Sequence, residues 1–583
     1  MSDDIESDPV KAYFLGPKSE NEAFVRAEIQ SILDRWFGWR KDLFPDDPAA
    51  ISRQDRVGIP FLKAREELAQ HLDTLNDLLA DEIPKYSPRY LGHMVSEVAL
   101  PAIFGHFAAL LHNPNNLSKE ASRVGTQLEA DVISMLATML GYDPAQANGH
   151  ITGGGTVANF EAIWRARFRQ DHWLSLALYL AREKQLTFDL YGAAHMGWPR
   201  FYELAAAHKV DFEEMRRYSA VAGNPYRVGA WMTQTFGFDY LGPVIMVPQN
   251  KHYSWAKGVS VFGLGEENFW PVPLDAAGVL DPDSLVTLIA RAEAENRPVM
   301  MVVSVAGTTE TGRIDPVHKV AAVLDELNES RGLDIWHHVD AAWGGFMCSL
   351  LGGSGECPAL SRASTQGLAA IRKAHSITID PHKLGYVPYS CGAILTRDPE
   401  SYTISSFEAP YLERQETERE KWSTTLEGSR SAAGVAATWL TGKTLGFDAD
   451  GIGAIITQSM KARQDFENAI GQACPAVRPL PGDNTNILCF SLADEGEPLS
   501  STNRRTKAAY ESFSACPDFS VSKTTLLFET YGKSFTAHLD TYGGTRDVDE
   551  LTLLRCVFMN PFWSVPEIRD RLTGELITIL QGL

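Results

Sequence analysis

Short apolar runs alternate with helical segments between residues 133 and 442, and this alternation constrains the fold more than any other feature of the sequence. The runs cover residues 244–247, 299–304, 334–339, 376–379 and 392–395. Each run is nearly all apolar and is bounded by Gly, Pro or Asn, which is typical of strands buried on both faces. Strands that alternate with helices predict an α/β domain built on a mostly parallel sheet.

The regions on either side of this core have different patterns. A chain of 583 residues exceeds what one hydrophobic core usually organises. Up to about residue 130 the pattern is mainly helical, whereas after residue 447 helical and strand patterns mix, as in a small α+β domain. We therefore predict an N-terminal helical segment at residues 1–130, a large domain at 131–445 and a small C-terminal domain at 446–583.

Charge and cysteine content limit the partners of the chain. The formal net charge of −21 argues against a nucleic-acid partner, because such proteins need a basic face. The seven cysteines include no C-x-x-C pair, so we expect neither a disulfide framework nor a metal site. The acidic N-terminus lacks the parts of a signal peptide, and the longest apolar stretch is too short to span a bilayer. These features predict a cytoplasmic protein with no membrane partner.

The sharpest chemical motif places Lys383 at the end of the predicted strand at 376–379, in the stretch Asp380-Pro-His-Lys383. Ligands of parallel sheets bind at the carboxyl ends of the strands. A lysine that leaves solvent there loses its proton more easily, which suits Schiff-base formation with an aldehyde. Taken alone, a solvated surface lysine is the more common setting.

Asp340 ends the preceding predicted strand and is followed by Ala341-Ala342-Trp343-Gly344-Gly345. A carboxylate in this position can hold a pyridine nitrogen protonated, which makes a cofactor ring an electron sink. The small Ala342 would let such a ring lie flat against the strand. The alternative is an ordinary helix N-cap aspartate.

A glycine cluster, Gly153-Gly154-Gly155 followed by Thr156, precedes a helical run at residues 160–168. Glycines let a backbone approach an anion, and the free amides at a helix start point toward it. In so acidic a protein we prefer a phosphate site, with a plain strand–helix turn as the alternative.

Two further motifs follow predicted strands. His252, in Lys251-His-Tyr-Ser-Trp255, can stack on a pyridine ring, although a packed or surface histidine is the more frequent outcome. Thr309, in the stretch 307–312, can reach a cofactor oxygen or merely shape a turn.

In this order the motifs resemble the group II pyridoxal-phosphate decarboxylases, whose most specific motifs match Asp340-Ala-Ala342 and Pro381-His-Lys383. The resemblance covers most of the chain, from about residue 84 to 562. It implies pyridoxal 5'-phosphate as cofactor and an α/β fold of the aspartate-aminotransferase type (fold type I). It also implies an obligate homodimer with the active site at the interface, in which residues 1–130 would serve dimerisation.

The resemblance also implies roles for single residues. By family position, the cofactor would be held by Gly155, Thr156, His252, Thr309, Asp340, Ala342, His382 and Lys383, with Lys383 and His252 also catalytic. Tyr411 matches the loop tyrosine that reaches the partner's active site and protonates the carbon that has lost its carboxylate.

Within this family the chain is most similar to bacterial-type tyrosine decarboxylases, through stretches such as 87–94, 115–122 and 379–389. This similarity suggests a substrate pocket made of His93, Met94, Ser96, Asn115 and Ser534. Two features depart from the pattern. Asp340 and Lys383 are 43 residues apart, which is longer than expected, and Asp380 stands where animal aromatic amino-acid decarboxylases carry asparagine.

The expected reaction is decarboxylation of an aromatic L-amino acid, tyrosine first, to the amine and carbon dioxide. One alternative is a substrate with a side-chain carboxylate, such as glutamate, which calls for a cationic anchor that only Arg89 offers near the proposed pocket. Another is decarboxylation that yields an aldehyde. A catalytically silent scaffold of the same fold is a third alternative, which the joint presence of Lys383, Asp340 and His252 disfavours.

Overall fold

The computed structural model describes residues 9–351, 360–405, 423–482, 485–515 and 518–582. A seven-stranded sheet forms its centre, in the order β2-β8-β7-β6-β5-β3-β4. The bounds are β2 (Asn148–Thr152), β3 (Val244–Pro248), β4 (Phe269–Val272), β5 (Val299–Val305), β6 (Trp336–Asp340), β7 (Ser376–Ile379) and β8 (Gly392–Thr396). β8 runs antiparallel to its neighbours and the remaining pairs are parallel. All five predicted strands are present, and the predicted mostly parallel sheet is confirmed.

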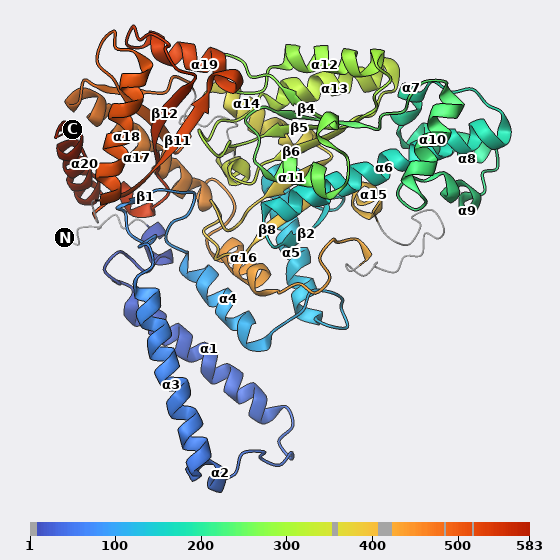
Figure 1. Cartoon of the computed structure of the whole chain (residues 1–583). Helices are drawn as coiled ribbons and strands as arrows, with labels where there is room; N and C mark the ends of the chain where they lie inside the picture. Colours follow the sequence, from blue (N-terminus) through green and yellow to red (C-terminus); the bar gives the residue numbers. More distant parts are fainter. Residues whose placement is uncertain (1–8, 352–359, 406–422, 483–484, 516–517, 583) are drawn as a thin grey trace, which may run out of the picture.

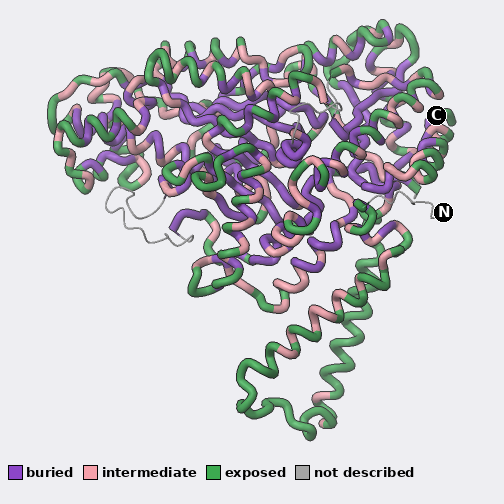
Figure 2. The backbone as a smooth tube through the Cα atoms, turned by 180° about the vertical axis from the view of Figure 1, so that it is seen from behind, coloured by how far each residue is buried: buried purple, intermediate pink, exposed green. Residues whose placement is uncertain are grey.

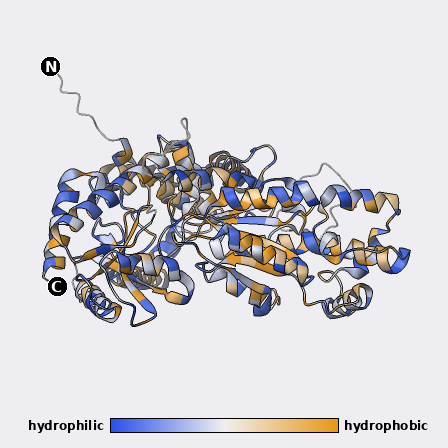
Figure 3. Cartoon of the chain, turned by 90° about the horizontal axis from the view of Figure 1, so that it is seen from above, coloured by the Kyte–Doolittle hydropathy of each residue, from blue (hydrophilic) through white to orange (hydrophobic). Residues whose placement is uncertain are grey.

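Helices cover both faces of this sheet (Figure 1). Successive side chains of a strand point to opposite faces, and on β3 both sets of side chains pack against helices. On β3, Val244 and Met246 pack against α12 (Pro282–Ala294) and α13 (Val317–Arg331). The intervening Ile245 and Val247 pack against α6 (Gly155–Lys184) and α11 (Ser254–Val261). Because both faces are covered, the strands are buried at nearly every position, including polar residues such as His337 and His338 of β6. In Figure 3 these strands accordingly appear as an apolar layer inside the molecule.

The C-terminal part of the chain forms a second sheet in the order β1-β11-β12-β10-β9. Its strands are β1 (Tyr90–Leu91), β9 (Val477–Pro479), β10 (Ile487–Leu492), β11 (Ser520–Leu527) and β12 (Glu550–Val557). Apolar side chains of this sheet pack against α17 (Ile452–Ala473), α18 (Leu499–Ala515) and α20 (Pro566–Gln581). β1 pairs with β11, so the residues just before Met94 are attached to the C-terminal sheet.

Three N-terminal helices extend away from the two sheets (Figures 1 and 2). They are α1 (Glu22–Asp42), α2 (Arg53–Val57) and α3 (Ile59–Ala80), and none of their residues is buried. The next helix, α4 (Leu100–His112), instead packs closely against α16 (Ala433–Thr444). Gly105 makes this approach possible, because a Cβ at this position would lie only 2.5 Å from the carbonyl oxygen of Ala436.

Four short helices lie beyond one end of the large sheet, where they pack on the C-terminal half of α6 (Figure 1). They are α7 (Leu190–Ala194), α8 (Gly197–Ala207), α9 (Phe212–Met215) and α10 (Pro225–Phe236). The remaining elements are α5 (Arg123–Leu140), α14 (Arg362–Ala370), α15 (Pro399–Thr403), α19 (Phe528–Asp540), η1 (Pro9–Tyr13), η2 (Arg216–Tyr218), η3 (Glu266–Asn268), η4 (Gly344–Leu351), η5 (Ile371–Lys373) and η7 (Pro561–Ser564). None of the helices in the described part of the chain is both long and apolar enough to cross a membrane. The division of the chain at residues 130/131 and 445/446 stays a prediction.

Candidate active site

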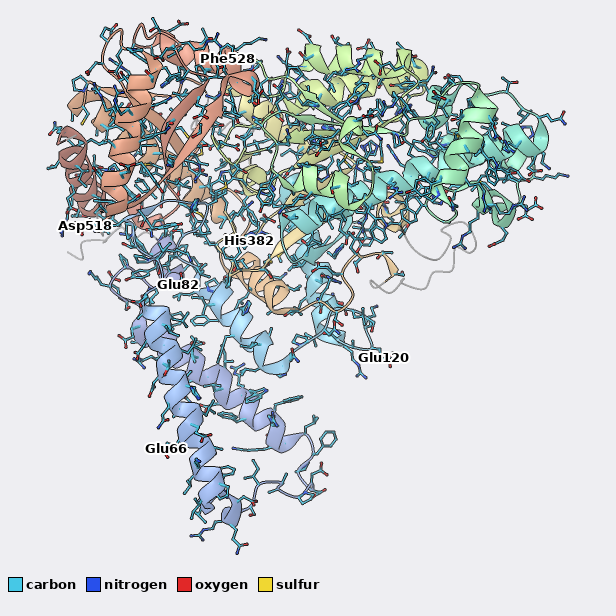
Figure 4. The ribbon with its side chains drawn as sticks, in the orientation of Figure 1. Glu66, Glu82, Glu120, His382, Asp518 and Phe528 are labelled. Atoms are coloured by element: carbon cyan, nitrogen blue, oxygen red, sulfur yellow. The ribbon has the colours of Figure 1, made fainter. Side chains whose placement is uncertain are left out.

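A cavity of about 320 Å³ lies at the carboxyl ends of the parallel strands. Nine of the residues predicted for the site line it: Met94, Gly155, Thr156, His252, Thr309, Asp340, Ala342, His382 and Lys383. Of these, His382 is labelled in Figure 4, where it lies near the centre of the molecule. Met94 reaches the cavity from the C-terminal sheet, where it follows β1. The other eight stand at or just after the ends of strands of the large sheet, and parallel strands end at the same edge of a sheet.

Asp340 is the last residue of β6 and is buried, with 4% of its surface exposed. Its Oδ2 accepts a hydrogen bond from Asn159 Nδ2 at 2.8 Å and another from Trp255 Nε1 at 3.0 Å. Its Oδ1 accepts from the backbone amide of Ala342 at 3.3 Å. The carboxylate is thus fixed in orientation at the wall of the cavity.

Lys383 lies one turn beyond β7, and its Nζ is 3.0 Å from Asp380 Oδ2. His382 Nε2 lies 3.5 Å from the same oxygen. His382 Nδ1 accepts from the amide of Cys391 at 3.1 Å, so in the neutral ring the proton is on Nε2. Burial lowers the pKa of His382. Asp380 therefore holds the lysine amine at the cavity, and His382 lies against the same carboxylate oxygen.

His252 lies in the connection between β3 and α11, and it lines the cavity. Its Nδ1 lies 2.9 Å from Ser254 Oγ and accepts from the amide of Ser254 at 3.3 Å. Burial lowers the pKa of this imidazole as well. The neutral ring can therefore lie against an aromatic cofactor without bringing a second charge.

The glycine cluster forms an oxyanion site at the start of α6. Gly154 has a φ of +148°, which favours glycine, and within the described residues no side chain caps the helix. The first amides of a helix have no partner inside it, so here they are available to a ligand. The amide of Gly153 donates to Glu427 Oε2 at 3.1 Å, so this turn holds an oxyanion in the present structure.

The donor set fits pyridoxal phosphate. The cavity is lined by the glycine turn with Thr156, by Lys383 with its amine, and by the Asp340 carboxylate. Asp380 Oδ1 is buried and has no hydrogen-bond partner in the described part of the chain, so a donor from a bound group can still be accommodated there.

Four of the five residues predicted for the substrate pocket do not line this cavity within the described chain; Met94 does. Asn115 Nδ2 donates to Ser429 Oγ at 3.0 Å, and Ser534 Oγ donates to the carbonyl of Ala276 at 3.0 Å. His93 is exposed, and Ser96 is half-buried. Their roles stay predictions, as does that of Tyr411, which lies outside the described residues.

Sequence reasoning gave no role to several residues that the fold brings to the site. Asn159, Asn250, Asp380 and Tyr389 line the cavity, and Trp255 contacts Asp340 from behind it. The helical spacing could have predicted Asn159, because it follows Gly155 by four positions and so lies on the same face of α6. The contact of Trp255 has no local signature.

Comparison with known proteins agrees with this geometry. Residues 240–492 match the sequence family described as the pyridoxal-dependent decarboxylase conserved domain. The chain is 29% identical to an L-tyrosine decarboxylase of Enterococcus faecium, over 98% of both chains. It is also 29% identical to an L-tyrosine decarboxylase of Levilactobacillus brevis, over 98% of this chain and 96% of the other.

Solved structures show the same fold. Oryza sativa TDC with PLP and tryptamine matches with a TM-score of 0.63 at 16% identity, over 97% of this chain and 99% of the other. Mouse CSAD matches with a TM-score of 0.62 at 18% identity, over 96% of this chain and all of the other. The predicted fold type I architecture is thereby confirmed. Together, the cavity and these matches show a pyridoxal-phosphate-dependent amino-acid decarboxylase.

Proposed function

We propose that this chain removes the α-carboxylate of an aromatic L-amino acid, tyrosine first, and releases the amine and carbon dioxide. The observation that carries the proposal is the cavity that joins Lys383, Asp340, His252 and the glycine turn. The choice of substrate is supported by the nearly full-length similarity to L-tyrosine decarboxylases. Among the described lining residues, Lys383 is the one lysine or arginine, so the cavity offers no second cation for a side-chain carboxylate.

In this proposal each lining group has one task. Gly155, Thr156 and the start of α6 would bind the phosphate, Asp340 the ring nitrogen, and His252 and Ala342 would flank the ring. When bound, pyridoxal phosphate supplies an aldehyde for the amines of Lys383 and of the substrate, and a ring that takes up electrons from the breaking bond to the carboxylate. Asp380 and His382 orient the Lys383 amine, and Thr309 completes the wall.

The proton that replaces the carboxylate is assigned to Tyr411 of the partner subunit. A phenol suits this task because it can hold a proton within hydrogen-bond reach of the carbon and release it there. This assignment requires a homodimer with a shared active site. It is supported by the apolar side chains that α1 and α3 leave exposed, among them Phe24, Phe37, Leu62, Leu72 and Leu75.

A cytoplasmic location is part of the same proposal. The five cysteines in the described ranges are Cys348, Cys391, Cys474, Cys489 and Cys556, and all are free and buried. Free thiols suit a reducing compartment.

A substrate panel tests the proposed function. Purified enzyme loaded with pyridoxal phosphate is given tyrosine, phenylalanine, tryptophan, glutamate or aspartate, and carbon dioxide and organic products are measured by mass spectrometry. We expect tyrosine to react fastest and to give the amine. The Lys383→Ala variant should lose the yellow colour, the borohydride-reducible link to the protein, and turnover. Activity on glutamate or aspartate alone contradicts the aromatic substrate, and aldehyde in place of amine contradicts the proposed product.

A further inference from the structure

The two oxygens of the Asp340 carboxylate have different surroundings. Oδ2 accepts two side-chain N–H groups, from Trp255 at 3.0 Å and from Asn159 at 2.8 Å. In the described part of the chain Oδ1 accepts one long bond, from the amide of Ala342 at 3.3 Å. The oxygen with spare acceptor capacity is therefore Oδ1.

Both donors to Oδ2 are built into the fold. Trp255 is fully buried in α11, with its ring 5.3 Å from that of His338, and Asn159 is 1% exposed on α6. The indole Nε1 can only donate, and in the described part of the chain it donates to Asp340. The amide nitrogen of Asn159 must face Asp340, because its oxygen would be repelled by the carboxylate.

The same asparagine connects Asp340 to His252. Asn159 Nδ2 also donates to Ser254 Oγ at 3.0 Å. The Ser254 hydroxyl then donates its own hydrogen to His252 Nδ1 at 2.9 Å. The Asp340 carboxylate only accepts, so Asn159 donates to it. The amide of Ser254 donates to His252 Nδ1 at 3.3 Å, so this ring nitrogen is an acceptor and the Ser254 hydroxyl donates to it. The chain fixes the His252 proton on Nε2.

We propose that Trp255 and Asn159 are positioning residues that occupy Oδ2 of Asp340 and so reserve Oδ1 for the ring nitrogen of pyridoxal phosphate. This inference rests on the proposed function and goes beyond it, because neither residue need touch substrate. A carboxylate held at one oxygen cannot rotate about its Cβ–Cγ bond, and its second oxygen keeps one direction. Removing either donor frees that rotation.

The test compares two tryptophans that are equally buried. Trp255→Phe removes the donor to Asp340. Trp336→Phe is the matched control, because Trp336 is also fully buried, yet its Nε1 donates at 2.9 Å to Ser376 Oγ, a neutral hydroxyl. For each holoenzyme, pyridoxal phosphate released on dilution is measured by absorbance to give a dissociation constant. Turnover and KM for tyrosine are then measured at saturating cofactor.

We expect Trp255→Phe to raise the dissociation constant about tenfold relative to Trp336→Phe, which corresponds to one charge-assisted hydrogen bond. Turnover should fall while KM for tyrosine changes by less than about twofold, since the substrate-binding groups are unaltered. Asn159→Ala, which removes the other donor, should weaken cofactor binding in the same direction and gives a second readout if Trp255→Phe does not fold.

Equal cofactor affinity in the Trp255→Phe and Trp336→Phe enzymes, with equal turnover, overturns the inference. The same holds if Asn159→Ala binds cofactor as tightly as the wild type. Failure of the proposed function looks different, because then the wild-type protein itself binds pyridoxal phosphate without releasing carbon dioxide from any aromatic amino acid.

Discussion

At Gly155 the cofactor site leaves no room for a side chain. A Cβ there would lie 2.9 Å from Asp380 Oδ2, 3.1 Å from Asp380 Oδ1 and 3.2 Å from the Cβ of Ala342. Asp380 is buried and holds Lys383, so it cannot move aside without displacing the lysine. One added methyl group thus disturbs both the oxyanion site and the Lys383 amine.

We therefore predict that Gly155→Ala weakens pyridoxal phosphate binding by about tenfold or more, the equivalent of ~1.4 kcal/mol. Absorbance titration of the purified variant measures the effect. Gly229→Ala is the control, because nothing lies within 4 Å of a Cβ at this position in α10. The control should bind cofactor normally and gain up to about 1 kcal/mol of stability from helix propensity. Unchanged affinity in Gly155→Ala would show that the phosphate is held elsewhere.

Local sequence predicted the residues that directly follow strands, and missed those that reach them from a distance. Asp340 and Lys383 stand at or just beyond the ends of apolar runs, where a pattern can point to them. Trp255 and Asn159 meet Asp340 across 85 and 181 positions of the sequence. The helical period places Asn159 on the same face of α6 as Gly155, but both contacts with Asp340 depend on how α6 and α11 pack on the sheet.

At the scale of elements, Glu97 attaches the N-terminal segment to the region before α4. Its Oε1 accepts from the amide of Gly16 at 3.0 Å, and its side chain is buried. Burial raises the pKa of Glu97 to about 7. In the unfolded chain the carboxyl would titrate near 4.5. Between these values the folded state binds the proton more tightly, so this group makes the protein less stable as the pH rises from 4.5 to 7.

Glu97→Gln keeps an acceptor oxygen and cannot ionise. The difference in free energy of unfolding between this variant and the wild type should therefore grow with pH, in favour of the variant. We predict a free energy of unfolding higher than that of the wild type by about 1–2 kcal/mol at pH 8, and equal to it at pH 5. Thermal melts across this range provide the measurement. Glu66→Gln, which removes an exposed carboxylate of α3, is the control and should leave the free energy of unfolding within about 0.5 kcal/mol of the wild type. A Glu97→Gln advantage that is constant with pH would contradict the assigned titration.

The predicted strands of the large sheet are stabilised by burial of their own side chains, whereas the unpredicted strand β1 is stabilised by pairing with a distant segment. The strands β3, β5, β6, β7 and β8 are buried on both faces, and most of their residues are apolar or β-branched, so short runs of such residues mark them. β1 has two residues and forms by parallel pairing of Tyr90 with Ser520, far along the chain. The pairing brings Met94 to the cavity, and no local pattern predicts it.

For the molecule as a whole, the helices α1 and α3 have apolar surface but no buried residue of their own. On α3, Leu68, Leu72 and Leu75 are spaced so that they lie along one face, and each is at least half exposed. A helix of this kind is stable in water when another surface covers its apolar face. The homodimer proposed above provides that surface.

Replacing Leu68, Leu72 and Leu75 with glutamine keeps helix propensity and removes the apolar face. We predict that this triple variant elutes with the mass of one chain rather than two when light scattering follows size-exclusion chromatography. Its turnover should fall at least tenfold, since Tyr411 of the partner would no longer reach Lys383. The control carries glutamine at Tyr226 and Leu241, two exposed apolar positions outside α1 and α3, and should remain dimeric and active. A triple variant that stays dimeric with full turnover would place the subunit interface elsewhere, whereas a monomer with full turnover would show that each chain holds a complete active site.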